Sequence, residues 1–445
     1  MATADIDGLD PDDYQPRRLA DAIDDAQSGS PKALARAETL LSRSFVRYVR
    51  DLHRPADVGM IFVDQSLAPK APSSTAILDA AAGALSARKP LEDALPLHPI
   101  YRQLRKSAAD WMERWGSLPN VRVPAGTTIA AGATGDRVER LRYRLGLDPV
   151  GSFDRSVAAA VREFQTAHGL AATGSADPKT IALLNEPIEQ QQARIRLNLE
   201  RARVLPSGND QRYVLVDAAA ARLWLYEGGR ARDSMRAIVG RVTEPTPMIA
   251  AKIDSAVLNP YWNVPPDLVA KRIAPNVLKE GIGHLKAARY EVLSDWTDDA
   301  KLVDPKTVDW AAVAAGRKEL PMRQLPGPAN SMGAMKFMFP NDFGVYLHDT
   351  PEKTLFGQAD RRQSAGCVRV EDAQRLAKWL FGSVPRAKSN KPEQEVALPE
   401  PVPVYITYLT AAPAERGIVF RDDFYGRDKK ALAAYASRTR SRQLK

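Results

Sequence analysis

The first 120 residues carry apolar side chains at the three- and four-residue spacing of amphipathic helices. This spacing predicts helices over Leu19–Ile23, Ala33–Val49 and Tyr101–Trp115. In the last of these helices, one face would hold Leu104, Ala108, Trp111 and Trp115. Because no cluster of acids, bases or metal ligands accompanies the pattern, we interpret residues 1–127 as a helical scaffold domain.

A separate compact unit of three short helices is predicted for residues 128–187. The first helix would begin at Asp136, and the second would follow Asp154, which would be its N-cap. The third would begin at the pair Asp177-Pro178, which favours a first helical turn. The apolar positions between these openings suit the core of a small bundle. A helical linker, residues 188–210, is expected to follow.

From Tyr213 the apolar period shortens to that of β-strands punctuated by turns. Strands are predicted at 213–216, 223–226, 235–239, 253–265, 336–339, 404–409 and 417–420. In the middle of this region the chain becomes helical and charged, which indicates a helical cap of about 267–325 inserted into a mainly β domain of residues 211–445. The stretch 384–402, rich in Pro, Lys and Glu, is expected to be a surface loop. These patterns together predict a multidomain α+β fold.

At 445 residues the chain is long enough for two to four domains with substantial cores. No run approaches the roughly 18 apolar residues of a membrane span. A single cysteine excludes an internal disulfide framework. The first residues, Met1-Ala2, lead directly into a polar, Asp-rich stretch, so the sequence carries no recognisable export signal.

The formal net charge of +9 suits a partner rich in carboxylates, and nucleic acid would be attracted by the same sign. The basic residues are spread along the chain and no nucleic-acid-binding motif appears, so we expect no nucleic-acid partner. The Lys/Arg-rich tail from Arg427 to Lys445 is expected to be a solvated helix or a frayed end.

No cofactor or metal site is indicated. Four histidines lack a Cys, His or carboxylate partner at metal-ligand spacing: His53, His98, His168 and His284. The run from Gly132 to Asp136 resembles a phosphate loop only superficially, because it lacks the Gly-Lys-Ser/Thr ending.

The candidate chemistry lies at the only cysteine, Cys367. A lone cysteine is usually a small buried hydrophobe, but Gly366 permits a tight turn that can aim successive N–H groups at one spot, as oxyanion stabilisation requires. The apolar pattern from Val370 predicts a helix, which would place the thiol just ahead of a helix N-terminus and favour the thiolate. Upstream, His348 ends an apolar strand and can accept the thiol proton.

His348 and, nineteen positions later, the cysteine of Ser-x-Gly-Cys-x-Arg resemble the active-site signature of the L,D-transpeptidases, the YkuD-type enzymes that cross-link bacterial peptidoglycan. The resemblance extends over nearly the whole chain. Further segments are similar to the large envelope subfamily that has an N-terminal scaffold: residues 195–201, 323–328, 336–341 and 346–351. The three-helix unit resembles the peptidoglycan-binding module. One departure is Ala365, where many relatives carry histidine, and it implies altered substrate contacts.

The resemblance implies a YkuD-like catalytic domain that forms 3-3 cross-links between stem peptides through a Cys367 thioester. It also implies a location in the periplasm or cell envelope, so an export segment is expected to have been removed. Stem peptides are the expected partners, and carbapenems or penems the expected inhibitors. Three alternatives stay open: a cysteine carboxypeptidase or amidase of stem peptides, a transpeptidase that anchors a protein or D-amino acid to the wall, and a non-catalytic wall-binding protein.

Other residues near the signature have two possible roles each. Arg369 could hold a stem-peptide carboxylate through paired N–H donors, or form a surface salt bridge. Tyr346 shares the strand face of His348 and could line the cleft or pack beside it, and Ser364 could supply its hydroxyl or only turn chemistry. Trp262 is a candidate for the cleft or for a core. Asp349 is expected to form a turn, with a backbone carbonyl orienting the imidazole instead.

Overall fold

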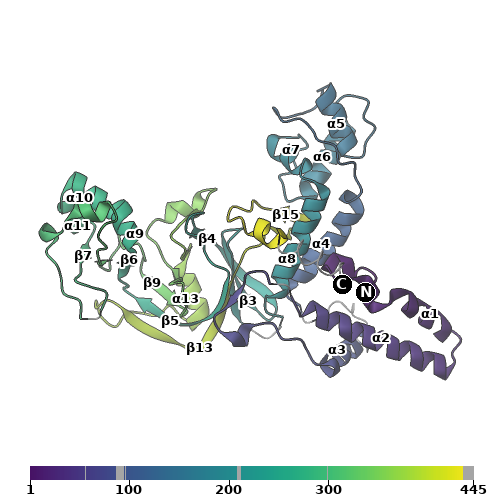
Figure 1. The fold of residues 1–445 in the computed structure, drawn as a ribbon, viewed down its shortest axis with the longest axis horizontal. Helices are drawn as coiled ribbons and strands as arrows, with labels where there is room; N and C mark the ends of the chain where they lie inside the picture. The colour runs from purple at the N-terminus through teal and green to yellow at the C-terminus, as the bar shows by residue number, and fades with distance from the viewer. Residues whose placement is uncertain (56, 87–94, 96, 208–211, 298, 434–445) are drawn as a thin grey trace. The chain divides into compact units, whose positions relative to one another are not determined.

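The computed structural model describes residues 1–55, 57–86, 95, 97–207, 212–297 and 299–433 (Figure 1). The chain divides into two compact units. The first comprises Met1–Gln211, Glu227–Arg230 and Thr407–Lys445, and the second comprises Arg212–Tyr226 and Ala231–Ile406. None of the helices in the described part of the chain combines the length and the apolar character that a bilayer crossing needs.

The first unit begins with the predicted amphipathic helices. They are α1 (Pro16–Ala26), α2 (Pro31–Leu52), α3 (Ser74–Ser86) and α4 (Pro99–Trp115). Three of them start with proline, whose fixed φ and missing N–H suit the first helical turn. The predicted face of α4 is buried as expected, from Leu104 to Trp115. Helix α3 was not predicted, because its run of alanines lacks a clear apolar stripe.

A buried carboxylate organises this helical region. Asp7, 1% exposed, accepts hydrogen bonds from the hydroxyls of Tyr48 (2.6 Å) and Tyr101 and from Arg105 Nε (2.8 Å). Three donors, one of them the cation Arg105, compensate the cost of burying the charge. Tyr48, Tyr101 and Arg105 come from different helical segments than Asp7, so the cluster joins the chain start to α2 and α4.

The predicted three-helix unit follows. It contains α5 (Asp136–Arg144), α6 (Arg155–Ala167) and α7 (Pro178–Leu184). Asp154 caps α6 by accepting from Ser156 N and Val157 N, which confirms the predicted N-cap. Asp177 caps α7 through Thr180 N, and the helix opens at Pro178, as the Asp177-Pro178 pair predicted. Helix α8 (Ile188–Arg203) occupies the predicted helical linker, of which residues 208–210 lie outside the described residues.

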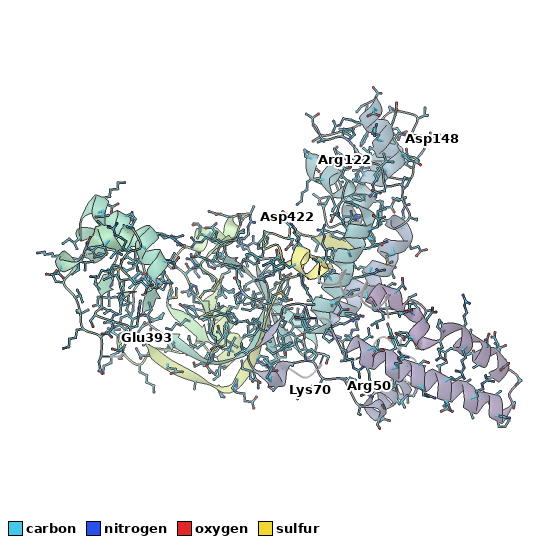
Figure 2. All side chains as sticks on the ribbon, in the orientation of Figure 1. Arg50, Lys70, Arg122, Asp148, Glu393 and Asp422 are labelled. Carbon is cyan, nitrogen blue, oxygen red and sulfur yellow. The ribbon has the colours of Figure 1, made fainter. Side chains whose placement is uncertain are left out.

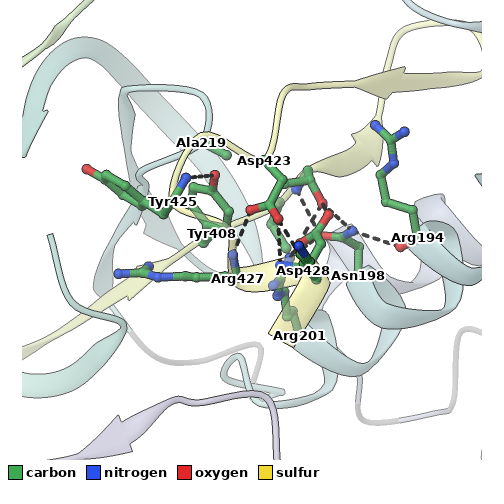
Figure 3. A network of polar contacts seen from close by, with 12 residues as sticks. Arg194, Asn198, Arg201, Ala219, Tyr408, Asp423, Tyr425, Arg427 and Asp428 are labelled. Carbon is green, nitrogen blue, oxygen red and sulfur yellow. Dashed lines mark hydrogen bonds and ion pairs between the residues drawn. The ribbon is translucent and has the colours of Figure 1, made fainter. Parts of the chain in front are cut away.

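The end of the chain is anchored to α8 by a buried polar network (Figure 3). Arg201, fully buried, donates to Asp428 Oδ1 (2.6 Å), and the Thr410 hydroxyl donates to Asp428 Oδ2 (2.6 Å). Asn198 also bonds Thr410, through its side chain at 2.8 Å. The prediction of a solvated tail is therefore wrong where the tail begins, because Asp428 is buried; residues 434–445 lie outside the described residues.

The second unit is built on a closed β-sheet. Its strands are β2 (Tyr213–Asp217), β3 (Arg222–Glu227), β4 (Arg230–Gly240), β5 (Ile249–Leu258), β9 (Met335–Met338), β10 (Leu347–His348), β12 (Val368–Val370) and β13 (Gln394–Thr407). They pair in the order β5-β13-β2-β3-β4-β12-β10-β9, and β9 pairs back to β5. The short β11 (Arg362–Ser364) adds to β4. Helix α13 (Ala373–Phe381) packs Leu376, Ala377 and Leu380 into the same core.

The prediction of a surface loop at 384–402 is wrong in its second half, because strand β13 begins at Gln394. Its register with β5 shifts between Ala397 and Val402. Prolines 399 and 401 lie in that interval, where the ladder does not need their missing N–H groups.

The inserted cap contains a small β-sheet as well as the predicted helices. Its helices are α9 (Pro266–Leu268), α10 (Ala274–Glu280), α11 (Gly283–Ala287) and α12 (Trp310–Ala314), with a π-helical turn at Val269–Ile273. They pack on a three-stranded sheet of β6 (Trp262–Val264), β8 (Met322–Gln324) and β7 (Tyr290–Val292). The residues of β6 lie within the predicted strand 253–265, but β7 and β8 were not predicted, because a three-residue strand carries too little alternation.

Candidate active site

The site forms where β10 lies parallel to β12. Leu347 pairs with Val368, and both are fully buried in the barrel core. Because strand side chains alternate between faces, the neighbours of this pair point to the opposite face. Those neighbours are Tyr346, His348, Cys367 and Arg369.

The turn before the cysteine is held by buried hydroxyls. Gly366 has φ of +105°, a conformation that residues with a Cβ rarely adopt. The Thr246 hydroxyl donates to Gly366 O (2.8 Å) and accepts from Gly240 N (2.8 Å). The Ser364 hydroxyl donates to Cys367 O (2.5 Å), so its observed role is to hold the turn. Thr246 was missed in the sequence, since more than a hundred residues separate it from the cysteine.

The thiol of Cys367 is half-buried, and its sulfur lies 3.6 Å from Gly344 O. Burial raises the pKa of Cys367 to about 11, against a smaller opposing effect of hydrogen bonding to Tyr346. The prediction of a thiol at a helix N-terminus is wrong. Strand β12 intervenes, and α13 starts only at Ala373. The macrodipole acts within the first turn of a helix, so it does not favour the thiolate here.

His348, 2% exposed, is oriented by the main chain. Its Nδ1 lies 2.6 Å from Asp349 O, so a proton on Nδ1 is donated to that carbonyl and Nε2 is the free acceptor. Burial, and then the nearby charge of Arg369, lower the pKa of His348 to about 3. The imidazole is therefore neutral near pH 7, as a general base must be.

The side chain of Asp349 points away from the imidazole. Its Oδ2 accepts from Ala334 N (2.9 Å), and its Oδ1 accepts from Lys353 Nζ (2.6 Å). The backbone carbonyl of Asp349 is thus the group that contacts the imidazole, as the sequence argument expected, whereas Asp349 itself does not lie in a turn.

Tyr346 lies beside both reactive groups. Its ring meets that of His348 edge-on, with centroids 5.7 Å apart. Burial raises the pKa of the Tyr346 phenol far above its usual value, and the adjacent Cys367 adds to the shift. The phenol therefore stays protonated and contributes a polar group to the reactive face.

Two cations flank the imidazole, one on each neighbouring strand. Arg369 on β12 and Lys336 on β9 both pair in register with His348. Arg369 forms an ion pair with Glu352 (2.5 Å), and Lys336 forms one with Glu393 (3.1 Å). Lys336 and Glu352 were missed, because strand pairing and not sequence proximity brings them here.

Trp262 lies in the cap, on β6. Its ring is tilted against Tyr290, with centroids 6.3 Å apart, and packs at the edge of the cap core. A contact between Trp262 and substrate stays a prediction. Within the described residues, no group of three or more His, Cys, Asp or Glu side chains is arranged to hold a metal ion.

Three family models match the chain. Residues 211–404 match the L,D-transpeptidase catalytic domain, YkuD, and residues 1–107 match the scaffold domain. Residues 137–184 match the "Putative peptidoglycan binding domain". The chain carries an L,D-transpeptidase catalytic domain of the YkuD family. The scaffold and peptidoglycan-binding matches both lie in the first unit.

A curated protein of Haemophilus influenzae, "Putative L,D-transpeptidase", is 30% identical over 244 residues. The match covers 53% of this chain and 48% of that protein, so the chain spans about half the length of this relative.

Solved L,D-transpeptidases are more distant. One from Xylanimonas cellulosilytica is 17% identical over 64% of this chain and 98% of its own, with a TM-score of 0.19. One from Mycobacterium smegmatis is 12% identical over 44% of this chain and 58% of its own, with a TM-score of 0.23.

Proposed function

We propose that this L,D-transpeptidase forms 3-3 cross-links between peptidoglycan stem peptides through a thioester on Cys367. The observation that carries the proposal is that a neutral, carbonyl-oriented imidazole and the only thiol of the chain lie on the same face of the paired β10 and β12 segments. A nucleophile, a base and a group that orients the base are the parts that covalent acyl transfer needs.

In the first half-reaction, Sγ attacks the carbonyl between the third stem residue and the terminal D-alanine while His348 Nε2 takes the thiol proton. The N–H groups of Gly366 and Cys367 are the candidates to stabilise the oxyanion. Collapse of the tetrahedral intermediate breaks the C–N bond, and His348 returns the proton to the departing D-alanine. The acyl group remains on sulfur.

In the second half-reaction, the side-chain amine of another stem attacks the thioester. His348 removes a proton from that amine, the C–S bond breaks, and the proton returns to the thiolate. Because burial raises the pKa of Cys367 to about 11, the thiol starts protonated, and proton transfer accompanies attack. A non-catalytic wall-binding protein would not need this arrangement.

The proposal places the protein in the periplasm or cell envelope, where cross-linked stems are found. Purified protein incubated with disaccharide-tetrapeptides should release D-alanine and yield 3-3-linked dimers, detected by mass spectrometry of the muropeptides. Tripeptides without dimers would instead indicate a carboxypeptidase, in which water takes the acyl group, and unchanged tetrapeptides would contradict acyl transfer altogether.

The ion pair between Arg369 and Glu352, which a substrate carboxylate could replace, gives a further prediction. If a stem carboxylate replaces Glu352 on the guanidinium, Arg369→Lys should lower kcat/KM about 10- to 100-fold, since lysine cannot form the paired donors. The defect should shrink on stems whose carboxylate is amidated. Arg362→Lys is the matched control, because Arg362 lies on β11, which pairs with β4 and not with β10, and forms an ion pair with Asp360 (2.7 Å). Equal defects on both stems would show that Arg369 only holds the local structure.

A further inference from the structure

The basic residues of the scaffold helix α2 form one stripe. At about 100° per residue, they fall within an arc of about 60°. They are Lys32, Arg36, Arg43, Arg47 and Arg50. The buried residues of the helix, which include Phe45, Val49 and Leu52, lie on the opposite side. Helix α2 is therefore cationic along its whole outer face.

The C-terminal part of this stripe borders a groove with a volume of about 650 Å³, which is the size of a small-ligand site. Helices α1 and α3 and the turn before α1 supply its other walls. Five arginines and two aspartates line it, which leaves an excess of three positive charges. The arginines are Arg18, Arg43, Arg47, Arg50 and Arg54.

The two carboxylates of the groove are already engaged by the same arginine. Arg47 contacts Asp13 at 2.7 Å and Asp51 at 3.7 Å, and Asp51 also accepts from the Tyr14 hydroxyl (3.1 Å). Arg43 and Arg50 are exposed, and within the described residues no side-chain hydrogen bond or ion pair engages their guanidinium groups; Figure 2 marks Arg50 on α2. Their donors are available to an anion, and guanidinium forks match phosphate oxygens in pairs.

Exposed apolar surface adjoins these donors. Leu78 on α3 lines the groove and is 38% exposed, and Leu85, two turns further along α3, is 68% exposed. Asp79 is the one ionisable residue among the thirteen of α3. A soluble anion would gain nothing from such leucines, whereas a membrane amphiphile offers phosphate and hydrocarbon side by side.

We propose that this groove, formed by α1, α2 and α3, docks the scaffold on an anionic phospholipid bilayer. The arginines bind headgroup phosphates, and Leu78 with the outer face of α3 contacts the acyl region. Clustered basic residues at a membrane surface contribute about 1 kcal/mol each. The docking is independent of the acyl-transfer site, and it would hold the first unit at the membrane surface.

The test is co-sedimentation of the full chain with vesicles of phosphatidylcholine, with and without about a third phosphatidylglycerol. The chain should sediment with the anionic vesicles only, and less so at high salt. Arg43→Gln/Arg50→Gln should weaken this binding about 30-fold, the equivalent of two such contacts. Arg140→Gln/Arg155→Gln, which removes two exposed charges from α5 and α6, is the matched control and should bind like the parent.

The variant Leu78→Gln distinguishes binding to a lipid from binding to a soluble phosphate. It should weaken vesicle binding several-fold while leaving the affinity for inorganic tripolyphosphate unchanged. Equal sedimentation with both kinds of vesicle, or equal loss in the two double variants, would overturn the proposal. It would also be overturned if Leu78→Gln bound vesicles like the parent, or if the α2 variant lost binding to peptidoglycan sacculi and kept binding to vesicles.

Discussion

Replacing Cys367 with alanine is expected to abolish cross-linking and D-alanine release, down to the uncatalysed background. The chain has one thiol, so no neighbouring sulfur can take over the attack. The fold should survive, because the side chain is small and half-buried and its turn is held by Ser364 and Thr246. Muropeptide mass spectrometry measures the loss, and circular dichroism with thermal unfolding checks the fold.

A carbapenem provides a second readout of the same variant. Its strained lactam imitates the scissile amide, so the parent protein should gain one adduct, mapped to Cys367, and Cys367→Ala should gain none. Val345→Ala, a truncation of a buried residue next to Gly344, is the control for local packing and should still be acylated. Cross-linking by Cys367→Ala, or label on a serine of the parent, would refute the assignment of the nucleophile.

His348→Ala is expected to lower kcat by a factor of about 10² to 10⁴, the usual contribution of a positioned general base. The hydrogen bond to Asp349 O fixes one tautomer of this buried imidazole and leaves Nε2 as the acceptor for the thiol proton. His284→Ala is the matched control, because His284 lies in the cap and contacts Glu280 (3.0 Å). A loss below tenfold in His348→Ala would place the base elsewhere.

The pH profile tests the same residue without a mutation. A histidine at its ordinary pKa of about 6.5 would be protonated, and inactive as a base, at pH 5. Because burial lowers the pKa of His348 to about 3, the neutral form persists at pH 5. The acidic limb of kcat/KM should therefore lie below pH 5, and a limb centred near 6.5 would show that the imidazole titrates as an exposed group does.

The sequence by itself determined those features that depend on interactions between residues close together in the chain. The spacing of apolar residues predicted α1, α2 and α4, and capping residues such as Asp154 and Asp177 predicted where α6 and α7 begin, because helices form bonds within one segment. The motif around Cys367 and His348 pointed to the catalytic family, since its residue types and turn glycine are local too.

What the sequence could not decide depends on pairing between distant segments. The three-residue strands of the cap and the bulged, proline-containing β13 become strands only through their partners. For the same reason the sequence did not predict that Thr246 bonds the turn before Cys367 or that Lys336 lies beside the imidazole.

The environment of the thiol was likewise decided by tertiary structure. A helical pattern after Val370 suggested a thiol activated by a helix dipole, but parallel pairing with β10 makes residues 368–370 a strand. Burial raises the pKa of Cys367 instead of lowering it, and the proposed mechanism therefore assigns the removal of the thiol proton to His348. A pKa is set by the charges and solvent around a group, and those surroundings exist only after the chain has folded.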